Sequence, residues 1–292
     1  MPLRLKTSRT LALAALVVVT AIWGSTFLLV KNAIQQVPVM DFLAIRFLLA
    51  AVVMIALRPA SVSRLTRQSL LRGAILGIAL GAAYITQTYG LLTASATVSG
   101  FITGTFVVLT PLVSWVLLRQ KINRNTFLAV VLASFGLALL GLHGWSIGIG
   151  ELLTLVCALF VAIHVVGLGA WASQHEIYGF ALVQIATVAL ISLVAASPDG
   201  IKVTSDFRFW VTIIITAVFA TAFAFIVQTW AQSLMPPTHA AVVMTMEPVF
   251  AGIFGIALGG ERPTLQIFAG ILCVLVAMYF IQFMRTPRLA KS

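Results

Sequence analysis

Ten stretches of almost uninterrupted apolar residues alternate with short polar connections along this chain. They cover approximately residues 11–30, 42–57, 73–92, 98–118, 126–142, 150–171, 178–196, 209–230, 239–258 and 264–283. A helix needs about 20 predominantly apolar residues to cross the roughly 30 Å of hydrocarbon in a bilayer. The pattern therefore predicts an all-α integral membrane protein with ten transmembrane helices and almost no chain left for a soluble domain.

Composition agrees with this pattern. The chain is 61% hydrophobic and only 9% charged, whereas soluble domains carry about 25% charged residues. A water-soluble globule is therefore excluded. The first apolar stretch is too long for a cleavable signal peptide, so we interpret it as the first span.

The basic residues gather in alternate connections. The N-terminus, the segments 58–72 and 119–124, and the tail after residue 283 hold thirteen Lys or Arg, while the opposite connections hold four. By the positive-inside rule, both termini are expected on the cytoplasmic side of a bacterial inner membrane. The net charge of +11 lies in connections without interleaved aromatic residues, so no nucleic-acid partner is expected.

The two halves of the chain resemble one another at an offset of 141 residues. In register, and in the same order, Tyr84, Gln87, Thr88 and Tyr89 match Phe225, Gln228, Thr229 and Trp230. Five spans per half is an odd number, so the second half must be inverted in the membrane. We therefore expect a first repeat over residues 1–145 and an inverted second repeat over 146–292, an organisation found in many secondary transporters.

Several segments resemble a known family. The W-G-S-T-F sequence at residues 23–27 resembles the W-G-x-x-F opening of the drug/metabolite transporter superfamily, in its ten-helix, EamA-type family. The segments 93–118 and 239–258, with their Thr110-Pro111 and Glu247-Pro248 pairs, resemble that family's A-x-x-A…P segment. The resemblance implies export of amino acids, including aromatic ones, or of drugs and related metabolites. The first half departs from it, because Pro111 stands four residues later than Pro248 predicts.

Glu247 is the one carboxylate well inside a predicted span, and Pro248 follows it. A proline there frees the carbonyl of Met244 from its helical hydrogen bond. Three interpretations remain open for Glu247: a protonated or hydrogen-bonded structural residue, a ligand for a substrate ammonium, or a proton-coupling residue. Phe106, its counterpart in the first half, can perform none of the three roles.

Two predicted helix faces carry aromatic and amide side chains. Tyr84, Gln87 and Thr88 share one face, and Phe225 and Gln228 share another. We expect these faces to line a cavity between the halves; interhelical hydrogen bonding is the alternative. The candidate substrate-binding residues are Trp23, Tyr84, Gln87, Thr88, Thr103, Phe106, His164, Phe225, Gln228, Met244 and Glu247.

Other polar residues in the spans carry weaker predictions. His164 matches Trp23 at the offset of 141, but a lone buried histidine is usually neutral and hydrogen-bonded. Arg46 lies near the outer end of the second span, where it is expected to snorkel or to pair with Asp41. The four histidines have no ligand spacing to one another, so no metal and no cofactor is predicted. Glycines at residues 73, 77 and 81 predict close helix packing.

These features favour a secondary exporter of amino acids or similar small metabolites, working by alternating access. The alternative is an exporter of cationic or aromatic drugs, coupled to protons through Glu247. The chain has no phosphate-binding loop for ATP and no nucleophile–base pair, so no enzyme is expected. The expected partners are a small-molecule substrate and the lipid bilayer, and the mechanism requires no oligomer.

Overall fold

A computed structural model describes residues 2–94, 96–119, 124–141 and 148–259, together with residues 265, 268–270, 272–273 and 275–277. All secondary structure in these residues is helical. The elements are α1 (Pro2–Ala33), α2 (Val39–Leu57), α3 (Ala60–Ser63), α4 (Arg67–Gly90), α5 (Ala96–Gly104), α6 (Phe106–Leu118), α7 (Arg124–Gly141), α8 (Ile149–Trp171), η1 (Ala172–Gln174), α9 (Ile177–Ala196), η2 (Ser197–Asp199), α10 (Phe207–Ile214), the π-helix η3 (Ile215–Phe223), α11 (Ala224–Gln232), α12 (Pro237–Met244) and α13 (Met246–Gly259).

The helices agree in position with the predicted spans. In the described part of the chain, seven helical segments are long and apolar enough to cross a membrane, by length and composition. They coincide with the first four predicted spans and with the sixth, seventh and eighth. The fifth corresponds to α7, whose apolar part is Phe127–Gly136, and the ninth to the shorter helices α12 and α13. Most of the tenth lies outside the described residues.

Two of the spans are interrupted at corresponding places, one residue apart in the repeat register. Thr105 separates α5 from α6, and Thr245 separates α12 from α13. The second break lies two residues before Glu247 and three before Pro248, as expected for a proline that removes a helical hydrogen bond. The first break occurs although Pro111 lies inside α6, so the two halves share this interruption while their prolines differ in position.

Glycines allow α4 to lie close to α9. A Cβ atom on Gly73 would lie 2.7 Å from Val183 Cγ1, and one on Gly77 would lie 2.5 Å from Thr187 Cβ. Such contacts are shorter than any real Cβ atom tolerates, so only glycine permits this approach. The glycine spacing therefore serves helix packing, as the sequence predicted.

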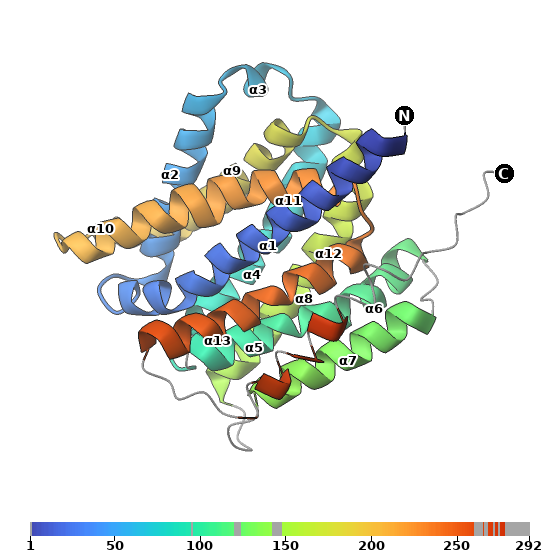
Figure 1. The fold of residues 1–292 in the computed structure, drawn as a ribbon. Helices are drawn as coiled ribbons and strands as arrows, with labels where there is room; N and C mark the ends of the chain where they lie inside the picture. Colours follow the sequence, from blue (N-terminus) through green and yellow to red (C-terminus); the bar gives the residue numbers. More distant parts are fainter. Residues whose placement is uncertain are drawn as a thin grey trace.

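Helices from the two halves of the chain are interleaved. The first helix, α1, lies between α11 on one side and α12 and α13 on the other, as Figure 1 shows. The helices α2 and α4 both pack against α9, and α4 also packs against α8. Residues that are far apart in the sequence therefore surround the centre of the bundle.

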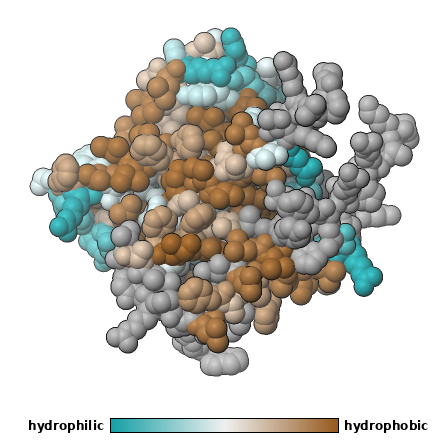
Figure 2. All heavy atoms as spheres, in the orientation of Figure 1, coloured by the Kyte–Doolittle hydropathy of each residue, from teal (hydrophilic) through white to brown (hydrophobic). Residues whose placement is uncertain are grey.

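The outer surface carries a broad apolar region. Figure 2 shows hydrophobic residues over the middle of the visible face, with hydrophilic residues at the top near α3 and at the left end near α10. Many large apolar side chains are exposed there and elsewhere on the surface, among them Leu190, Val194 and Ile214. An apolar surface of this extent is typical of a protein surrounded by lipid.

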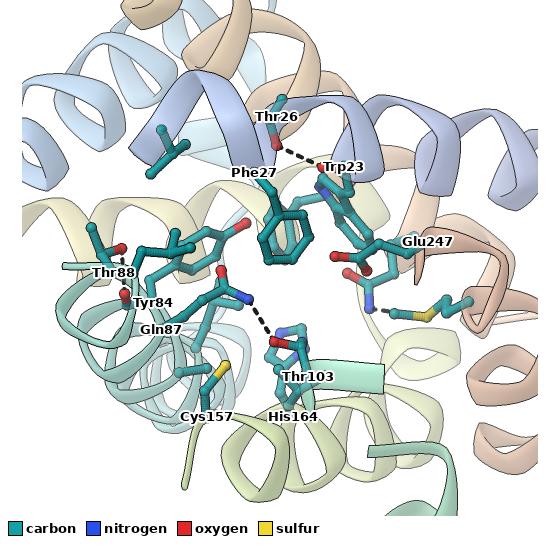
Figure 3. Close-up of a pocket in the computed structure, with 18 of the residues that line it drawn as sticks. Trp23, Thr26, Phe27, Tyr84, Gln87, Thr88, Thr103, Cys157, His164 and Glu247 are labelled. Carbon is teal, nitrogen blue, oxygen red and sulfur yellow. Dashed lines mark hydrogen bonds between the residues drawn. The ribbon is translucent and has the colours of Figure 1, made fainter. Parts of the chain in front are cut away.

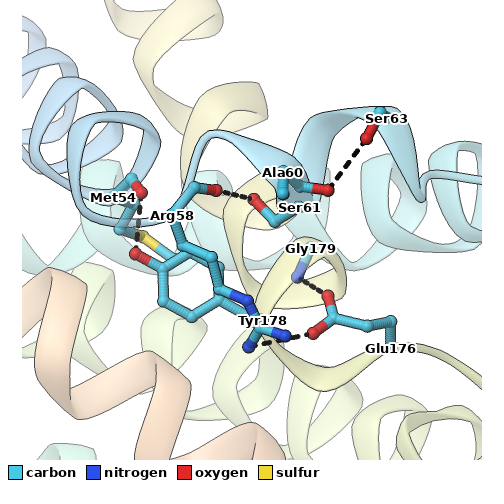
Figure 4. A network of polar contacts seen from close by, with 8 residues as sticks. All are labelled: Met54, Arg58, Ala60, Ser61, Ser63, Glu176, Tyr178 and Gly179. Carbon is cyan, nitrogen blue, oxygen red and sulfur yellow. Dashed lines mark hydrogen bonds and ion pairs between the residues drawn. The ribbon is translucent and has the colours of Figure 1, made fainter.

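A polar network connects the end of α2 with the start of α9 (Figure 4). Glu176 accepts a hydrogen bond from the Gly179 backbone N–H at 2.6 Å and forms an ion pair with Arg58 at 3.3 Å. The Tyr178 hydroxyl donates to the Met54 carbonyl at 2.7 Å. Glu176 therefore caps α9 and also joins it to the segment after α2.

Replacing Glu176 with alanine is expected to cost about 1 kcal/mol of stability, because the start of α9 loses its cap. The Arg58→Ala variant is the comparison, since it removes only a partly exposed ion pair and its ring contact, and exposed pairs contribute about 0.2–1 kcal/mol. Melting temperatures of the purified proteins in detergent measure both effects. Equal losses in the two variants would show that the ion pair matters more than the cap.

Candidate functional site

A cavity lies among the helices at the centre of the bundle (Figure 3). Its volume is about 70 Å³, whereas about 10–15 Å³ is enough to hold one water molecule. The lining residues come from α1, α2, α4, α5, α8, α11, α12 and α13, and from Leu91 directly after α4. They are Trp23, Thr26, Phe27, Val30, Arg46, Leu80, Ala83, Tyr84, Gln87, Thr88, Leu91, Thr103, Cys157, Val161, His164, Phe225, Gln228, Met244 and Glu247.

The structure brings ten of the eleven candidate site residues together on this cavity. The exception is Phe106, which is 1% exposed and packs in the apolar core. Phe106 opens α6 directly after the break at Thr105. Phe106 therefore does not line this cavity, and the counterpart positions Phe106 and Glu247 have different surroundings.

Eight of the nineteen lining residues match one another across the repeat. Each of four pairs at the offset of 141 contributes both members to the cavity. The pairs are Trp23 with His164, Tyr84 with Phe225, Gln87 with Gln228, and Thr103 with Met244. Both halves of the chain therefore contribute equivalent positions to one cavity, although the side chains differ in chemistry.

Aromatic rings form one wall of the cavity. The Phe225 ring lies 5.6 Å from Trp23, 6.2 Å from Tyr84 and 6.0 Å from His164, measured between ring centroids. The Trp23 Nε1–H donates to the carbonyl of Ala220 in the π-helix η3, at 2.8 Å. A hydrogen bond to the second half of the chain therefore holds the Trp23 ring in place. The aromatic cluster presents apolar faces to a molecule bound in the cavity.

Glu247 points into the space between the helices, opposite Gln87 (Figure 3). The side chain is 8% exposed, and no hydrogen bond or ion pair joins it to any other described residue. An ionised carboxylate buried without a partner is costly, so a purely structural Glu247 would have to be protonated. A protonated structural residue, a substrate ligand and a proton-coupling residue all fit these surroundings.

The backbone of Glu247 is held against α1. A Cβ atom on Gly24 would lie 2.6 Å from the Glu247 carbonyl oxygen and 2.8 Å from the Ala251 backbone nitrogen. Only a glycine at this position lets α1 approach α13 so closely. The Trp23-Gly24 pair therefore places an aromatic ring and a carboxylate on the same cavity.

His164 is fixed by a partner outside the cavity. Its Nε2 lies 2.7 Å from Gln184 Oε1, and the Gln184 amide nitrogen in turn donates to the Phe180 carbonyl at 2.9 Å. Because Gln184 presents its oxygen, His164 Nε2 carries the proton and donates it. In the neutral ring Nδ1 is then an acceptor. The histidine is hydrogen-bonded, as expected, and lines the cavity as well.

The two matched glutamines have different partners. The Gln87 amide donates to Thr103 Oγ1 at 3.1 Å, and the Gln228 amide donates to Gln232 Oε1 at 3.0 Å. Gln228 is 1% exposed, and its Oε1 has no hydrogen-bond partner in the described part of the chain. Interhelical hydrogen bonding and cavity lining therefore occur together, and Gln228 leaves one acceptor for a bound molecule.

Arg46 departs most from the sequence-based expectation. It is 3% exposed and lines the cavity. It does not pair with Asp41, whose carboxylate accepts from the Lys202 backbone N–H at 2.9 Å. The prediction of a snorkelling or Asp41-paired side chain was wrong, because α2 packs against η3 and α9 and directs this residue inward. The sequence contained a sign of this inward position, because Arg46 is the one cation inside a predicted span.

The described residues contain no group of three or more histidine, cysteine, aspartate or glutamate side chains placed to hold a metal ion. Cys157 lines the cavity as a free thiol. The site instead combines aromatic faces, amides, hydroxyls and two charged groups. This chemistry suits reversible binding of a small polar molecule.

Comparison with known proteins gives a consistent result. The EamA-like transporter family matches this chain twice, over residues 10–142 and 148–283. An uncharacterized transporter of Archaeoglobus fulgidus is 32% identical over 271 residues, covering 91% of this chain and 84% of its own length. The uncharacterized transporter YetK of Bacillus subtilis is 25% identical over 284 residues, covering 92% of this chain and 86% of that protein.

A crystal structure of a protein shares the fold, with a TM-score of 0.76 and 18% identity, over 94% of this chain and 96% of that one. The two family matches lie on either side of residue 145, which agrees with a repeated architecture. The family is one of transporters rather than enzymes. The chain is therefore a multi-pass integral membrane protein that belongs to the EamA-like transporter family.

Proposed function

We propose that this protein is a secondary transporter that exports amino acids or similar small metabolites across the bacterial inner membrane. The observation that carries the proposal is the central cavity, where residues of both halves surround Glu247, a carboxylate with no partner among the described residues. Burying a polar side chain in the membrane interior costs free energy, so a charged residue found there is a candidate for a functional role.

The proposed architecture is ten transmembrane helices in two inverted five-helix repeats, residues 1–145 and 146–292. The helix contacts support it. At the offset of 141 residues, α1 corresponds to α8, α2 to α9, α4 to the segment that includes η3 and α11, and α6 to α13. Each contact between two helices therefore has an equivalent between their counterparts. The α4–α8 contact is equivalent to α1–α11, α4–α9 to α2–η3, and α1–α13 to α6–α8. Two arrangements of nearly equal energy, opening to opposite sides, follow from such a repeat.

The two ends of the cavity differ in packing. Val30, Thr88 and Leu91 lie at one end. Toward the start of α1, an apolar cluster fills the space, and Arg9 donates to His239 Nδ1 at 2.8 Å. The cluster consists of Ala12, Leu16, Ala231, Met235, Ala240 and Val243. With both termini in the cytoplasm, as the charge distribution favours, this cluster separates the cavity from the cytoplasmic side.

Uptake of radiolabelled threonine, methionine and phenylalanine into liposomes containing the purified protein tests the proposal. We expect saturable uptake that protein-free liposomes lack. Uptake without an imposed pH gradient identifies a facilitative carrier, and uptake only with a gradient identifies proton coupling. Absence of saturable uptake for all three amino acids, with and without the gradient, would contradict the proposal.

A lipophilic cation is the second candidate substrate. Glu247 lies on the same cavity as the rings of Trp23, Phe27 and Phe225, and aromatic faces attract cations. Tetraphenylphosphonium uptake in the same liposomes measures this activity. Uptake of this cation without uptake of amino acids would assign the protein to drug export.

A further inference from the structure

The buried cation Arg46 is held rigidly beside the cavity. Its Nε–H donates to Thr221 Oγ1 in the π-helix η3 at 2.9 Å, and Nη2 donates to the Tyr84 hydroxyl at 3.4 Å. The guanidinium also lies 4.8 Å from the centre of the Tyr84 ring and 5.4 Å from that of Phe47. Two hydrogen bonds and two aromatic faces therefore fix its orientation.

These contacts leave the charge of Arg46 without a counter-ion. Thr221 and Tyr84 are neutral acceptors, and no described carboxylate forms an ion pair with Arg46. A guanidinium has five N–H donors, and two of them make the hydrogen bonds above. An arginine buried in this way is costly unless a negative group joins it. Its planar array of donors matches a carboxylate, which it can bind through two parallel hydrogen bonds.

The same cavity also presents acceptors without partners. Glu247 makes no hydrogen bond with the described residues, and Gln228 Oε1 is buried without a partner. Arg46, Tyr84 and Glu247 line the same cavity, so both charged groups face a common space. The site therefore offers the donors of a cation from α2, a neutral amide oxygen from α11 and a carboxylate from α13.

We propose that Arg46 binds the carboxylate of the substrate while Glu247, assisted by Gln228 Oε1, binds its ammonium group. The cavity then selects zwitterionic amino acids by requiring both charges in one molecule. This assignment rests on the proposed transport function and deepens it. A substrate with only a positive charge leaves Arg46 unpaired and is repelled by it. A substrate with only a negative charge leaves Glu247 unpaired and is repelled by that carboxylate.

The wild-type protein tests this assignment without any substitution. Three forms of the amino acid that gives the best uptake are compared as competitors: the free amino acid, its N-acetyl derivative and its primary amide. The first derivative lacks the ammonium, and the second lacks the carboxylate. We expect each derivative to compete about a hundredfold more weakly than the free amino acid, since each leaves one buried charge unpaired.

Variants of Arg46 then assign the carboxylate to this side chain. The Arg46→Gln variant is expected to lose about tenfold or more in affinity for the free amino acid and to stop discriminating it from the amide. It should still reject the N-acetyl form, because Glu247 is intact. Arg46→Lys keeps the charge and is expected to retain the discrimination. Arg208→Gln is the matched control, because Arg208 is exposed at the start of α10 and is expected to behave as wild type.

The outcomes separate the two proposals. If wild-type liposomes take up no amino acid, the proposed function fails. If they do, but the amide or the N-acetyl form competes as well as the free amino acid, the assignment of Arg46 and Glu247 is overturned while transport stands. An Arg46→Gln variant that weakens both competitors equally and keeps the discrimination would also overturn it. Should Arg46→Gln fail to fold, competition by the two derivatives in the wild-type protein and in Arg46→Lys still tests the assignment.

Discussion

Amino-acid uptake by the Glu247→Gln variant is expected to fall about ten- to a hundredfold relative to the wild-type protein at equal density in liposomes. Glutamine keeps the shape of the side chain but removes the charge, and a hydrogen bond to a charged group contributes about 1.5–3 kcal/mol. The melting temperature is expected to change little, because Glu247 makes no hydrogen bond with the described residues. Initial uptake rates and thermal unfolding of the same preparation measure both quantities.

The control for this experiment is Glu151→Gln. Glu151 lies in the first turn of α8 and is not one of the residues lining the cavity, so its variant removes an equal charge elsewhere. Wild-type uptake in Glu247→Gln, with unchanged dependence on pH, would remove Glu247 from the mechanism. A loss of uptake in both variants would show a general effect of charge rather than an effect on binding.

The Gly24→Ala variant is expected to lose most of both its stability and its transport activity. The added methyl group would lie 2.6 Å from the Glu247 carbonyl oxygen and 2.8 Å from the Ala251 nitrogen. Both are backbone atoms, so relief requires α1 and α13 to move apart. Overpacking costs about 1–3 kcal/mol, and the shift also displaces Trp23 and Glu247 in the cavity. Yield after size-exclusion chromatography, melting temperature and uptake rate measure the loss.

Gly252→Ala is the matched control in the opposing helix. A Cβ atom on Gly252 meets no atom of the described residues within 4 Å, so this variant makes the same chemical change without a clash in the described structure. We expect it to fold and transport as the wild-type protein does. A Gly24→Ala variant with normal melting temperature and uptake would contradict the packing described for α1 and α13.

Much of the fold could be predicted from the sequence, because membrane helices have a simple physical requirement. Long apolar stretches give the position of each helix almost independently of its neighbours. The gathering of Tyr84, Gln87, Phe225 and Gln228 on one cavity could also be predicted. Their recurrence at a fixed offset placed equivalent helix faces opposite one another, as a repeated architecture requires.

The positions of Arg46 and Phe106 depend on packing between helices. The residue pattern within a single helix cannot predict that packing. Arg46 was assigned to the span end because of Asp41, but the neighbours of α2 turn it toward the cavity. Phe106 was placed in the cavity because of its register with Glu247, yet it lies in the apolar core. The π-helix that receives hydrogen bonds from Trp23 and Arg46 has no distinctive sequence pattern.

The interleaving of the halves has a consequence for biogenesis. The glycine face of α4 is matched by Val183 and Thr187 of α9, which leave the ribosome about a hundred residues later. Until then α4 lies in the membrane without the helix that packs against its glycine face. Assembly of the first half must therefore wait for the second. The same logic implies that the two halves, synthesised as separate chains, contain complementary surfaces through which they can find one another in the membrane.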